Sequence, residues 1–269
     1  MLENSVLHNI NILKAEIRLR FGIPLHQLEN LVSVSNNQVS GINLASSELD
    51  GLPYSITKFP NIVSINANSN KITEIPDFIT ELLELRVLEL KRNNIEELPE
   101  SFGNLSNLQR LDLDYNQFYK FPIELLDLSS LQLLYLDENP LHQLPEAIDR
   151  LAQLEYLYLK NCLLEELPLR FGNLNLKFLD LSYNQLFEVP PLNQEIRYLN
   201  LSHNNLENFP QSITKMHSLE ILELGHNTID RLPVELGYMT KLKLISIVNN
   251  PDIIVPDILK QNMSINLIQ

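Results

Sequence analysis

The apolar residues of this chain recur with a period of 23 residues along most of its length. The repeating unit has the form L-x-x-L-x-L-x-x-N-x-L-x-x-L-P, and ten such units can be aligned. They begin at Val39, Ile62, Leu85, Leu108, Leu131, Leu154, Leu176, Ile196, Leu219 and Leu242. A repeat of this length predicts a solenoid, in which each unit packs against its neighbours and one core runs through all of them.

Each unit opens with a short strand. In the third unit Leu88 and Leu90 are apolar, whereas Glu89 and Lys91 are polar. This alternation has the two-residue period of a strand with one buried face. The apolar residue and proline that follow predict a short helical turn, because proline fits the first turn of a helix. We expect the strands on the concave side and the helical turns on the convex side.

The residue that follows each strand has a predicted structural function. An asparagine amide both donates and accepts, so it can satisfy buried backbone groups where the chain leaves the strand. The members of this predicted ladder are Asn70, Asn93, Asn116, Asn139, Cys162, Asn184, Asn204, Asn227 and Asn250. Because Cys162 falls in this register, we interpret it as a buried ladder residue and not as a nucleophile or redox sensor.

Both ends of the chain lie outside the repeat register. Residues 1–38 are predicted to form a helical cap over the first repeat, with a docking helix for a partner as the alternative. One face of this helix would be formed by Val6, Ile10, Leu13 and Ile17. The repeat domain spans 39–264, and residues 265–269 are predicted to form a strand that covers the last repeat.

The seventh unit is the shortest. It has 20 residues, reads LKFLDLSYNQLFEVPPLNQE, and carries Pro190 and Pro191 where other units have room for a helical turn. We expect a thinner convex wall at this unit. The shortening is either a neutral deletion or a bend that shapes the binding face.

The charge of the chain narrows the choice of partner. The chain has 269 residues, a formal net charge of −14 and a pI of about 4.8. Nucleic-acid binders need a basic stripe, and anionic membrane surfaces attract basic segments, so neither nucleic acid nor a membrane is expected as a partner.

Cysteine usage and the N-terminal sequence bear on location. With Cys162 as its one cysteine the chain cannot form an intrachain disulfide, which favours a reducing compartment. The N-terminus lacks the continuous apolar stretch of a signal peptide, and no apolar run is long enough to span a bilayer. We therefore expect a cytoplasmic protein.

The repeat pattern resembles that of the leucine-rich repeat family over residues 39–264, about five-sixths of the chain. The 23-residue units with Leu-Pro are similar to those of intracellular Ras-pathway scaffolds and many bacterial proteins, and the seventh unit resembles the 20-residue form of bacterial effectors. The resemblance implies an α/β fold: a right-handed solenoid with a parallel β-sheet on the concave face and short helical or 3-10 turns on the convex face. It also implies a protein-binding scaffold, either alone or as the recognition part of a larger effector or signalling protein.

Aromatic and acidic residues gather at the outward positions of the middle strands. Neighbouring strands lie about 4.8 Å apart, so rings at matching positions should form one patch. Tyrosine combines an apolar ring with a polar tip, which suits interface hot spots, and carboxylates attract basic partners. The predicted partner-binding residues are Tyr115, Tyr135, Tyr156, Tyr158, Phe178, Tyr183, Tyr198, Asp112, Asp114, Asp137, Asp180 and Glu223. The expected partner is a protein or peptide with lysine or arginine; the alternative is that the rings only pack against each other across strands.

No sequence motif indicates catalysis. There is no glycine-rich phosphate loop, no H-E-x-x-H and no cysteine cluster. Asp112 and Asp114 are expected on an open concave face, where nothing would shift a pKa or exclude water. His203 and His226 occupy the same position of adjacent units, which favours a pH-sensitive surface pair over a metal site. We therefore predict a non-enzymatic monomer without cofactor or metal, with carbohydrate binding as the alternative to peptide binding.

Overall fold

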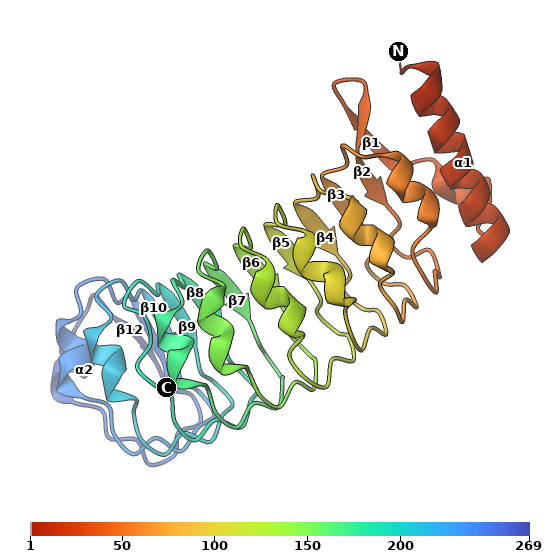
Figure 1. The fold of residues 1–269 in the computed structure, drawn as a ribbon. Helices are drawn as coiled ribbons and strands as arrows, with labels where there is room; N and C mark the ends of the chain where they lie inside the picture. The colour runs from red at the N-terminus through yellow and green to blue at the C-terminus, as the bar shows by residue number, and fades with distance from the viewer. Residues whose placement is uncertain (1) are drawn as a thin grey trace. The chain divides into compact units, whose positions relative to one another are not determined.

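The computed structural model describes residues 2–269, apart from the side chain of Leu25. Within this range the strands form a largely parallel 12-stranded sheet in sequence order (Figure 1). The strands of the repeats are β2 (Gln38–Asn43), β3 (Ser64–Asn66), β4 (Val87–Glu89), β5 (Arg110–Asp112), β6 (Leu133–Tyr135), β7 (Tyr156–Tyr158), β8 (Phe178–Asp180), β9 (Tyr198–Asn200), β10 (Ile221–Glu223) and β11 (Leu244–Ser246). The predicted solenoid, with one short strand at the start of each repeat, is confirmed.

Each repeat helix begins directly after its proline. The 3-10 helices are η2 (Tyr54–Lys58), η3 (Asp77–Glu81), η4 (Glu100–Asn104), η5 (Ile123–Asp127), η6 (Glu146–Arg150), η7 (Leu169–Asn173), η8 (Gln211–Lys215) and η9 (Val234–Tyr238), and the tenth repeat has the α-helix α2 (Asp257–Gln261). Each proline is the N-cap residue with an extended ψ, and its carbonyl accepts the first backbone hydrogen bond of the helix, as Pro53 accepts from the Ile56 N–H at 3.2 Å. The third residue of each 3-10 helix turns inward, and Ile79, Phe102 and Phe171 are almost fully buried.

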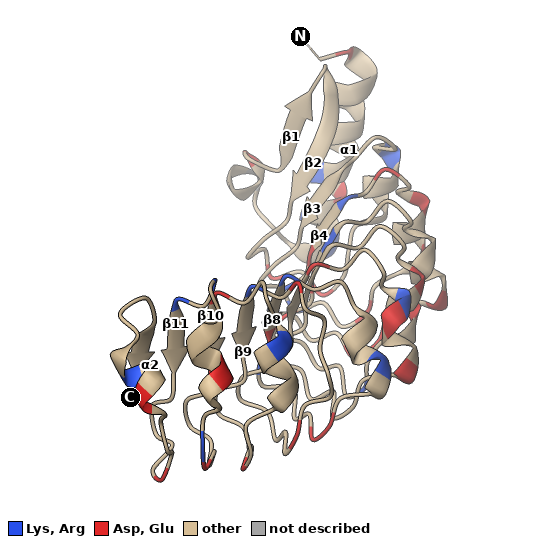
Figure 2. Ribbon diagram, turned by 90° about the vertical axis from the view of Figure 1, so that its left-hand side faces the viewer, with Lys and Arg blue, Asp and Glu red and all other residues tan. Residues whose placement is uncertain are grey.

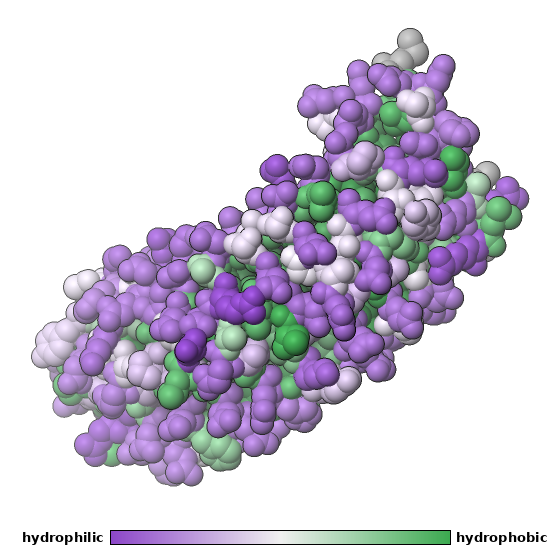
Figure 3. Space-filling model, viewed as in Figure 1, coloured by the Kyte–Doolittle hydropathy of each residue, from purple (hydrophilic) through white to green (hydrophobic). Residues whose placement is uncertain are grey.

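The chain divides into two compact units. Unit 1 comprises Met1–Phe118 and Pro122–Leu134, and unit 2 comprises Tyr119–Phe121 and Tyr135–Gln269. In each unit the apolar residue at the centre of a repeat strand is buried, as at Leu88 of unit 1 and Leu179 of unit 2. Charged residues lie mainly in the turns and helices (Figure 2). On the side seen in Figure 3, exposed apolar side chains form small separate patches among polar ones, so hydropathy alone does not mark a docking face there.

Within each unit, asparagines of the ladder tie a repeat to the preceding one. Asn93 Nδ2 donates to the Ala67 carbonyl of the preceding repeat at 3.0 Å and to the Leu90 carbonyl of its own repeat at 2.8 Å. Its Oδ1 accepts from the Ile72 N–H at 3.1 Å. These bonds supply partners to backbone groups that are buried away from water, which is the function expected of an amide at this position.

Cys162 holds the ladder position of the sixth repeat with a thiol in place of an amide. Its Sγ donates to the Leu136 carbonyl at 3.2 Å, and the side chain is fully buried. A thiol is a poor substitute for the amide oxygen as an acceptor. The Leu141 N–H, which would face that oxygen, instead donates to the Asn139 carbonyl at 2.8 Å. A local change in the preceding turn thus accompanies the cysteine.

Helix α1 (Asn4–Phe21) covers the first repeat of unit 1. Its buried residues are Ile10, Leu13 and Ile17. The Glu16 carboxylate accepts from the Tyr54 N–H at 2.8 Å and the Ser55 N–H at 2.9 Å, which lie at the start of η2. Charge-assisted bonds of this kind satisfy donors that a helix leaves unpaired at its N-terminus. The helix is held by these bonds and by apolar packing, which favours a cap over a free docking helix.

A β-hairpin follows η1 (Leu25–Leu28) and was not predicted from the sequence. Strand β1 (Val32–Ser35) pairs antiparallel with β2. The two strands are joined by Asn36 and Asn37, whose φ angles are 50° and 61°. Two central residues with positive φ form a type I′ turn, for which asparagine is favoured. The two asparagines between strand-like runs are the signal for this turn, which the helical pattern of residues 1–38 does not reveal.

The seventh repeat has no helix between β8 and β9, all of whose intervening residues are described. Its missing helical turn is thereby confirmed. In place of a helix, the Pro191 carbonyl lies against Gly172 of η7, where a Cβ would come within 2.1 Å of the Pro191 oxygen. A glycine at position 172 is therefore required for the shortened repeat to pack against its neighbour.

Replacing Gly172 with alanine is expected to lower the free energy of unfolding by about 1–3 kcal/mol, because the Pro191 backbone must move away from the added methyl group. Urea unfolding followed by circular dichroism measures this change. Gly51→Ala is the matched control, since the nearest atom to its Cβ would be the end of the flexible Arg20 side chain at 3.2 Å. Equal stability of the two variants would contradict the close approach of Pro191.

The last strand, β12 (Asn266–Ile268), pairs in parallel with β11. It lies within residues 265–269, for which a capping strand is expected. None of the described helices is long and apolar enough to cross a membrane.

Candidate functional site

Four aromatic rings of unit 2 stack in a continuous line, here called the aromatic row. Its members are Tyr135, Tyr158, Phe178 and Tyr198. Successive ring centroids are 4.4, 4.6 and 4.4 Å apart, and the successive interplanar angles are 20°, 31° and 3°. The row does not follow the backbone register of the sheet. Tyr158 is paired with Asp180 in the register, but its ring stacks on Phe178, which is paired with Tyr156.

Stacking determines which parts of these rings a partner can reach. Rings inside the row turn their faces toward each other, so they offer mainly edges and phenol hydroxyls to solvent. Tyr156 lies on the same strand as Tyr158 but outside the row, and it is 39% exposed. Among the described residues no ring or cation is stacked against Tyr156. It is therefore the ring of this group with a face open to a partner.

Three carboxylates accompany the aromatic row. Asp137 accepts from the Lys160 N–H at 2.7 Å, and Asp180 accepts from the Ser182 N–H at 2.8 Å. Within residues 2–269, Glu223 has no hydrogen bond or ion pair to its side chain. Glu223 is thus the carboxylate that is most available to an incoming cation.

The phenols of Tyr158 and Tyr198 stay protonated across the physiological range. Burial raises the pKa of Tyr158 to about 12, and Tyr135, Asp137 and Asp180 add to the rise. Burial, with Asp180 and Glu223 nearby, likewise raises the pKa of Tyr198 to about 12. The carboxylates therefore supply negative charge at this surface, while the phenols of Tyr158 and Tyr198 contribute neutral donors and acceptors.

A second stack, here called the turn stack, consists of Tyr183, His203 and His226 at the turns that follow the strands. Its centroids are 3.9 and 3.8 Å apart, and Lys160 Nζ lies 4.8 Å from the Tyr183 ring centre. Each of the three stacked residues has positive φ, between 54° and 58°. Lys160 was not among the predicted site residues, although its position directly before the turn is a signal for this contact.

The stacked geometry of His203 and His226 affects the pKa of His203 and disfavours a shared metal ion. Burial, with His226 and Lys160 close by, lowers the pKa of His203 below its ordinary value. Near-parallel imidazoles direct their nitrogen lone pairs side by side and not toward one point, which is poor geometry for a shared metal ion. No group of three metal-ligating side chains gathers in residues 2–269.

The remaining predicted site residues, Tyr115, Asp112 and Asp114, belong to unit 1. Tyr115 is 42% exposed, with Lys91 Nζ and Arg92 Cζ each 5.3 Å from its ring centre. Asp112 and Asp114 are buried, at 6% and 3% exposure, and Lys91 pairs with Asp114 at 3.0 Å. Burial leaves these two carboxylates little surface for a partner.

Asp112 departs from the expectation that nothing on the strand face shifts its pKa. Burial, together with the nearby Asp114 carboxylate, raises the pKa of Asp112 to about 6. The expectation was wrong because this outward position is covered by neighbouring side chains, so water solvates the carboxylate poorly.

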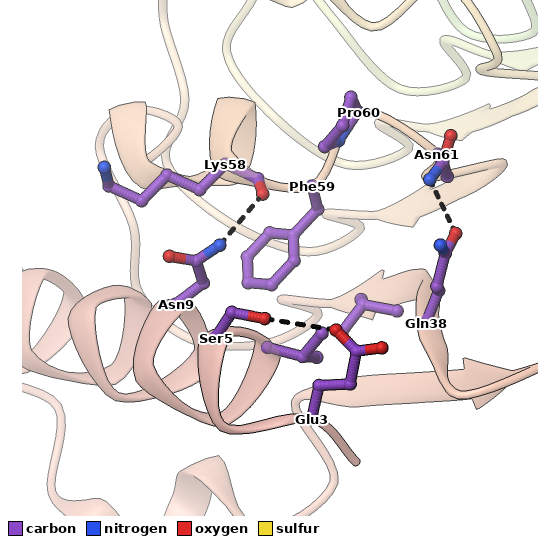
Figure 4. Close-up of a pocket in the computed structure, with 10 residues that line it drawn as sticks. Glu3, Ser5, Asn9, Gln38, Lys58, Phe59, Pro60 and Asn61 are labelled. Carbon is purple, nitrogen blue, oxygen red and sulfur yellow. Dashed lines mark hydrogen bonds between the residues drawn. The ribbon is translucent and has the colours of Figure 1, made fainter.

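A small recess of about 210 Å³ lies between α1 and the first repeats of unit 1 (Figure 4). Phe59 forms part of its wall, and Asn9 of α1 donates to the Lys58 carbonyl at 3.3 Å across it. Asn61 donates to the Gln38 side chain at the other end. These contacts join the cap to the repeats, so we interpret the recess as part of the cap junction.

Family comparison agrees with the repeat register. Leucine-rich repeat models match residues 60–118, 153–174, 175–193 and 194–251. The chain belongs to the leucine-rich repeat family. No curated protein matches this leucine-rich repeat chain by sequence.

Solved structures share the fold. A leucine-rich repeat protein of Leptospira interrogans is 27% identical over 91% of this chain and 74% of its own, with a TM-score of 0.68. The ectodomain of the Arabidopsis thaliana receptor kinase GASSHO1/SCHENGEN3, solved in complex with CASPARIAN STRIP INTEGRITY FACTOR 2, is 30% identical with a TM-score of 0.65. That match covers 78% of this chain and 27% of the receptor chain. The plant peptide hormone receptor RGFR1, solved with RGF2, is 25% identical over 84% of this chain and 42% of its own, with a TM-score of 0.64.

Proposed function

We propose that this leucine-rich repeat chain is a non-enzymatic scaffold that binds a protein or peptide with basic residues on the strand face of unit 2. The observation that carries the proposal is a tyrosine ring with an open face, Tyr156, on a strand of the aromatic row. An unpaired carboxylate, Glu223, lies on β10, the strand next to that of Tyr198. An aromatic ring of this kind is a typical hot spot, and the carboxylates would attract a basic partner and fix its position.

The stacked rings have a supporting function in this proposal. Their mutual contacts hold the surface in one conformation before a partner arrives, so little conformational entropy is lost on binding. Tyr156 then contacts the partner through its open face, while Glu223 and Asp180 accept hydrogen bonds from lysine or arginine. The plant receptors solved with CASPARIAN STRIP INTEGRITY FACTOR 2 and RGF2 support a peptide or protein ligand for this fold.

The same geometry weighs against carbohydrate binding. Sugars stack on the flat faces of aromatic rings, and in the aromatic row those faces are largely covered by neighbouring rings. For catalysis, only repeat sequences are matched and no catalytic domain is found. A binding function therefore fits the strand face better than either alternative.

The test begins with partners captured from a lysate of the source cells and continues with purified proteins. Tyr156→Ala combined with Glu223→Gln is expected to weaken binding of the identified partner at least about tenfold, because it removes the open ring and the free carboxylate. Isothermal titration calorimetry gives the affinity. Higher salt should also slow association, since charge attraction contributes to the encounter.

Tyr238→Ala is the matched control, because Tyr238 is a 71% exposed tyrosine at the end of η9 and not on the strand face. A partner that binds all three proteins equally would place the interaction outside the strand face of unit 2. Loss of the partner only with Tyr238→Ala would also place the interaction outside the strand face of unit 2.

A further inference from the structure

The shortened seventh repeat lies beside a recess on the helix side of unit 2. The recess has a volume of about 430 Å³. It is lined by residues of three consecutive repeats, among them Glu146, Glu166, Glu188, Leu169, Pro190 and Pro191. Its position follows from the missing helix, because the loop at Pro190 and Pro191 is too short to fill the space that a helical turn fills in other repeats.

A large apolar side chain is exposed at the edge of the recess. Leu169 is the first residue of η7 and is 81% exposed. Ile123 and Val234 hold the same place in η5 and η9, and they are 64% and 50% exposed. Helix α2 of the next repeat lies beside η9, whereas no helix stands in the fully described stretch between β8 and β9 to lie beside η7. A large apolar side chain exposed at the edge of a recess is a feature of interaction sites.

The charged residues that line the recess are all acidic. Glu146, Glu166 and Glu188 all line it, and no lining residue is basic. Over residues 2–269 none of the three has an ion pair or a side-chain hydrogen bond. Because the whole chain carries a net charge of −14, a second copy would be repelled from this surface. A basic partner would instead be attracted to it.

We infer that this recess is a second docking site, for a short partner segment in which lysine or arginine alternates with leucine-sized apolar residues. The apolar side chains of the segment cover Leu169 and the two prolines, and its cations pair with the three glutamates. The volume is within the range of pockets that hold small ligands, so it accommodates one or two side chains. This site is separate from the strand face and does not depend on the function proposed for it.

The test uses synthetic peptides and the whole chain. Acetylated Leu-Lys-Leu-Lys peptide is titrated while the methyl resonances of Leu167, Leu169 and Val189 are followed by nuclear magnetic resonance. Ser-Lys-Ser-Lys and Leu-Glu-Leu-Glu peptides are titrated in parallel. We expect the Leu-Lys peptide to shift these methyl resonances, and both other peptides to bind at least about tenfold more weakly.

Two triple variants locate the binding. Glu146→Gln, Glu166→Gln and Glu188→Gln together are expected to weaken the Leu-Lys peptide about tenfold or more. The matched control neutralises Glu74, Glu97 and Glu100, which hold the equivalent places around Pro76 and Pro99 in unit 1. This control, and Tyr156→Ala, should leave the affinity unchanged.

Three results would overturn the inference. One is the absence of methyl shifts at millimolar Leu-Lys peptide. Another is equal binding of the Ser-Lys peptide, which would indicate attraction by charge alone. The third is loss of binding in the Tyr156→Ala variant, which would assign the peptide to the strand face.

Discussion

Replacing Asn184 with alanine is expected to lower the free energy of unfolding by about 3–5 kcal/mol, because it leaves several buried backbone groups without partners. Asn184 Nδ2 donates to the carbonyls of Leu159 and Leu181 at 2.8 and 2.9 Å. Its Oδ1 accepts from the N–H groups of Cys162 and Leu164, both at 3.0 Å. Alanine can make none of these bonds, and water cannot replace them in the interior.

Urea unfolding measures this loss, with Asn205→Ala as the control. Asn205 is exposed, and among the described residues its side chain makes one bond, to the Gln185 carbonyl at 3.3 Å, so its replacement should cost less than about 1 kcal/mol. A similar small cost for Asn184→Ala would mean that the ladder amides do not stabilise the stack.

Asp112→Asn is expected to stabilise the protein at neutral pH by roughly 2–3 kcal/mol. The pKa of Asp112 rises from its ordinary value of 3.8 to about 6 in the folded state, and each tenfold change in proton affinity corresponds to about 1.4 kcal/mol. Because the folded pKa is the higher one, the contribution of Asp112 to stability is fully present below about pH 3.8 and is lost as the pH rises through about 6. Asparagine avoids this loss because it carries no charge.

The measurement compares the unfolding free energies of wild type and Asp112→Asn between pH 4 and 7.5. The difference cancels the carboxylates that both proteins share, so it should grow with pH and level off above about pH 7. Asparagine keeps an oxygen to accept the Asp114 N–H, which Asp112 Oδ1 does at 3.1 Å. A difference that is independent of pH would show that Asp112 titrates normally.

The sequence predicts the fold well because ten aligned repeats show the same pattern, so the structure of one unit applies to the equivalent positions of the others. The strands, the proline-initiated helices and the missing helix of the seventh repeat all follow from register. The hairpin at Asn36 and Asn37 is different, since it occurs once and its signal is only two residues long. Local turn chemistry, and not periodicity, determines that element.

The candidate site is only partly predictable for a related reason. Period alone assigns Tyr156, Tyr158 and Phe178 to one surface, but it does not say which rings touch. Side-chain rotamers place Tyr158 on Phe178 and leave Tyr156 open, and they are set by packing in three dimensions. In the same way an outward position does not guarantee exposure, as the burial of Asp112 demonstrates.

The positive φ angles of Tyr183, His203 and His226 lower the stability of the fold, while these side chains form the stacked surface. Asn161 and Asn249 occupy the same turn position as Tyr183 and His203, with φ of 52° and 54°. Asparagine tolerates this conformation with less strain than an aromatic residue does, so a design that optimised stability alone would place asparagine at every such turn. The designed protein would gain stability and lose the stacked tyrosine and histidines. Variation among these turns is therefore where a family of such proteins could diverge in recognition without altering the scaffold.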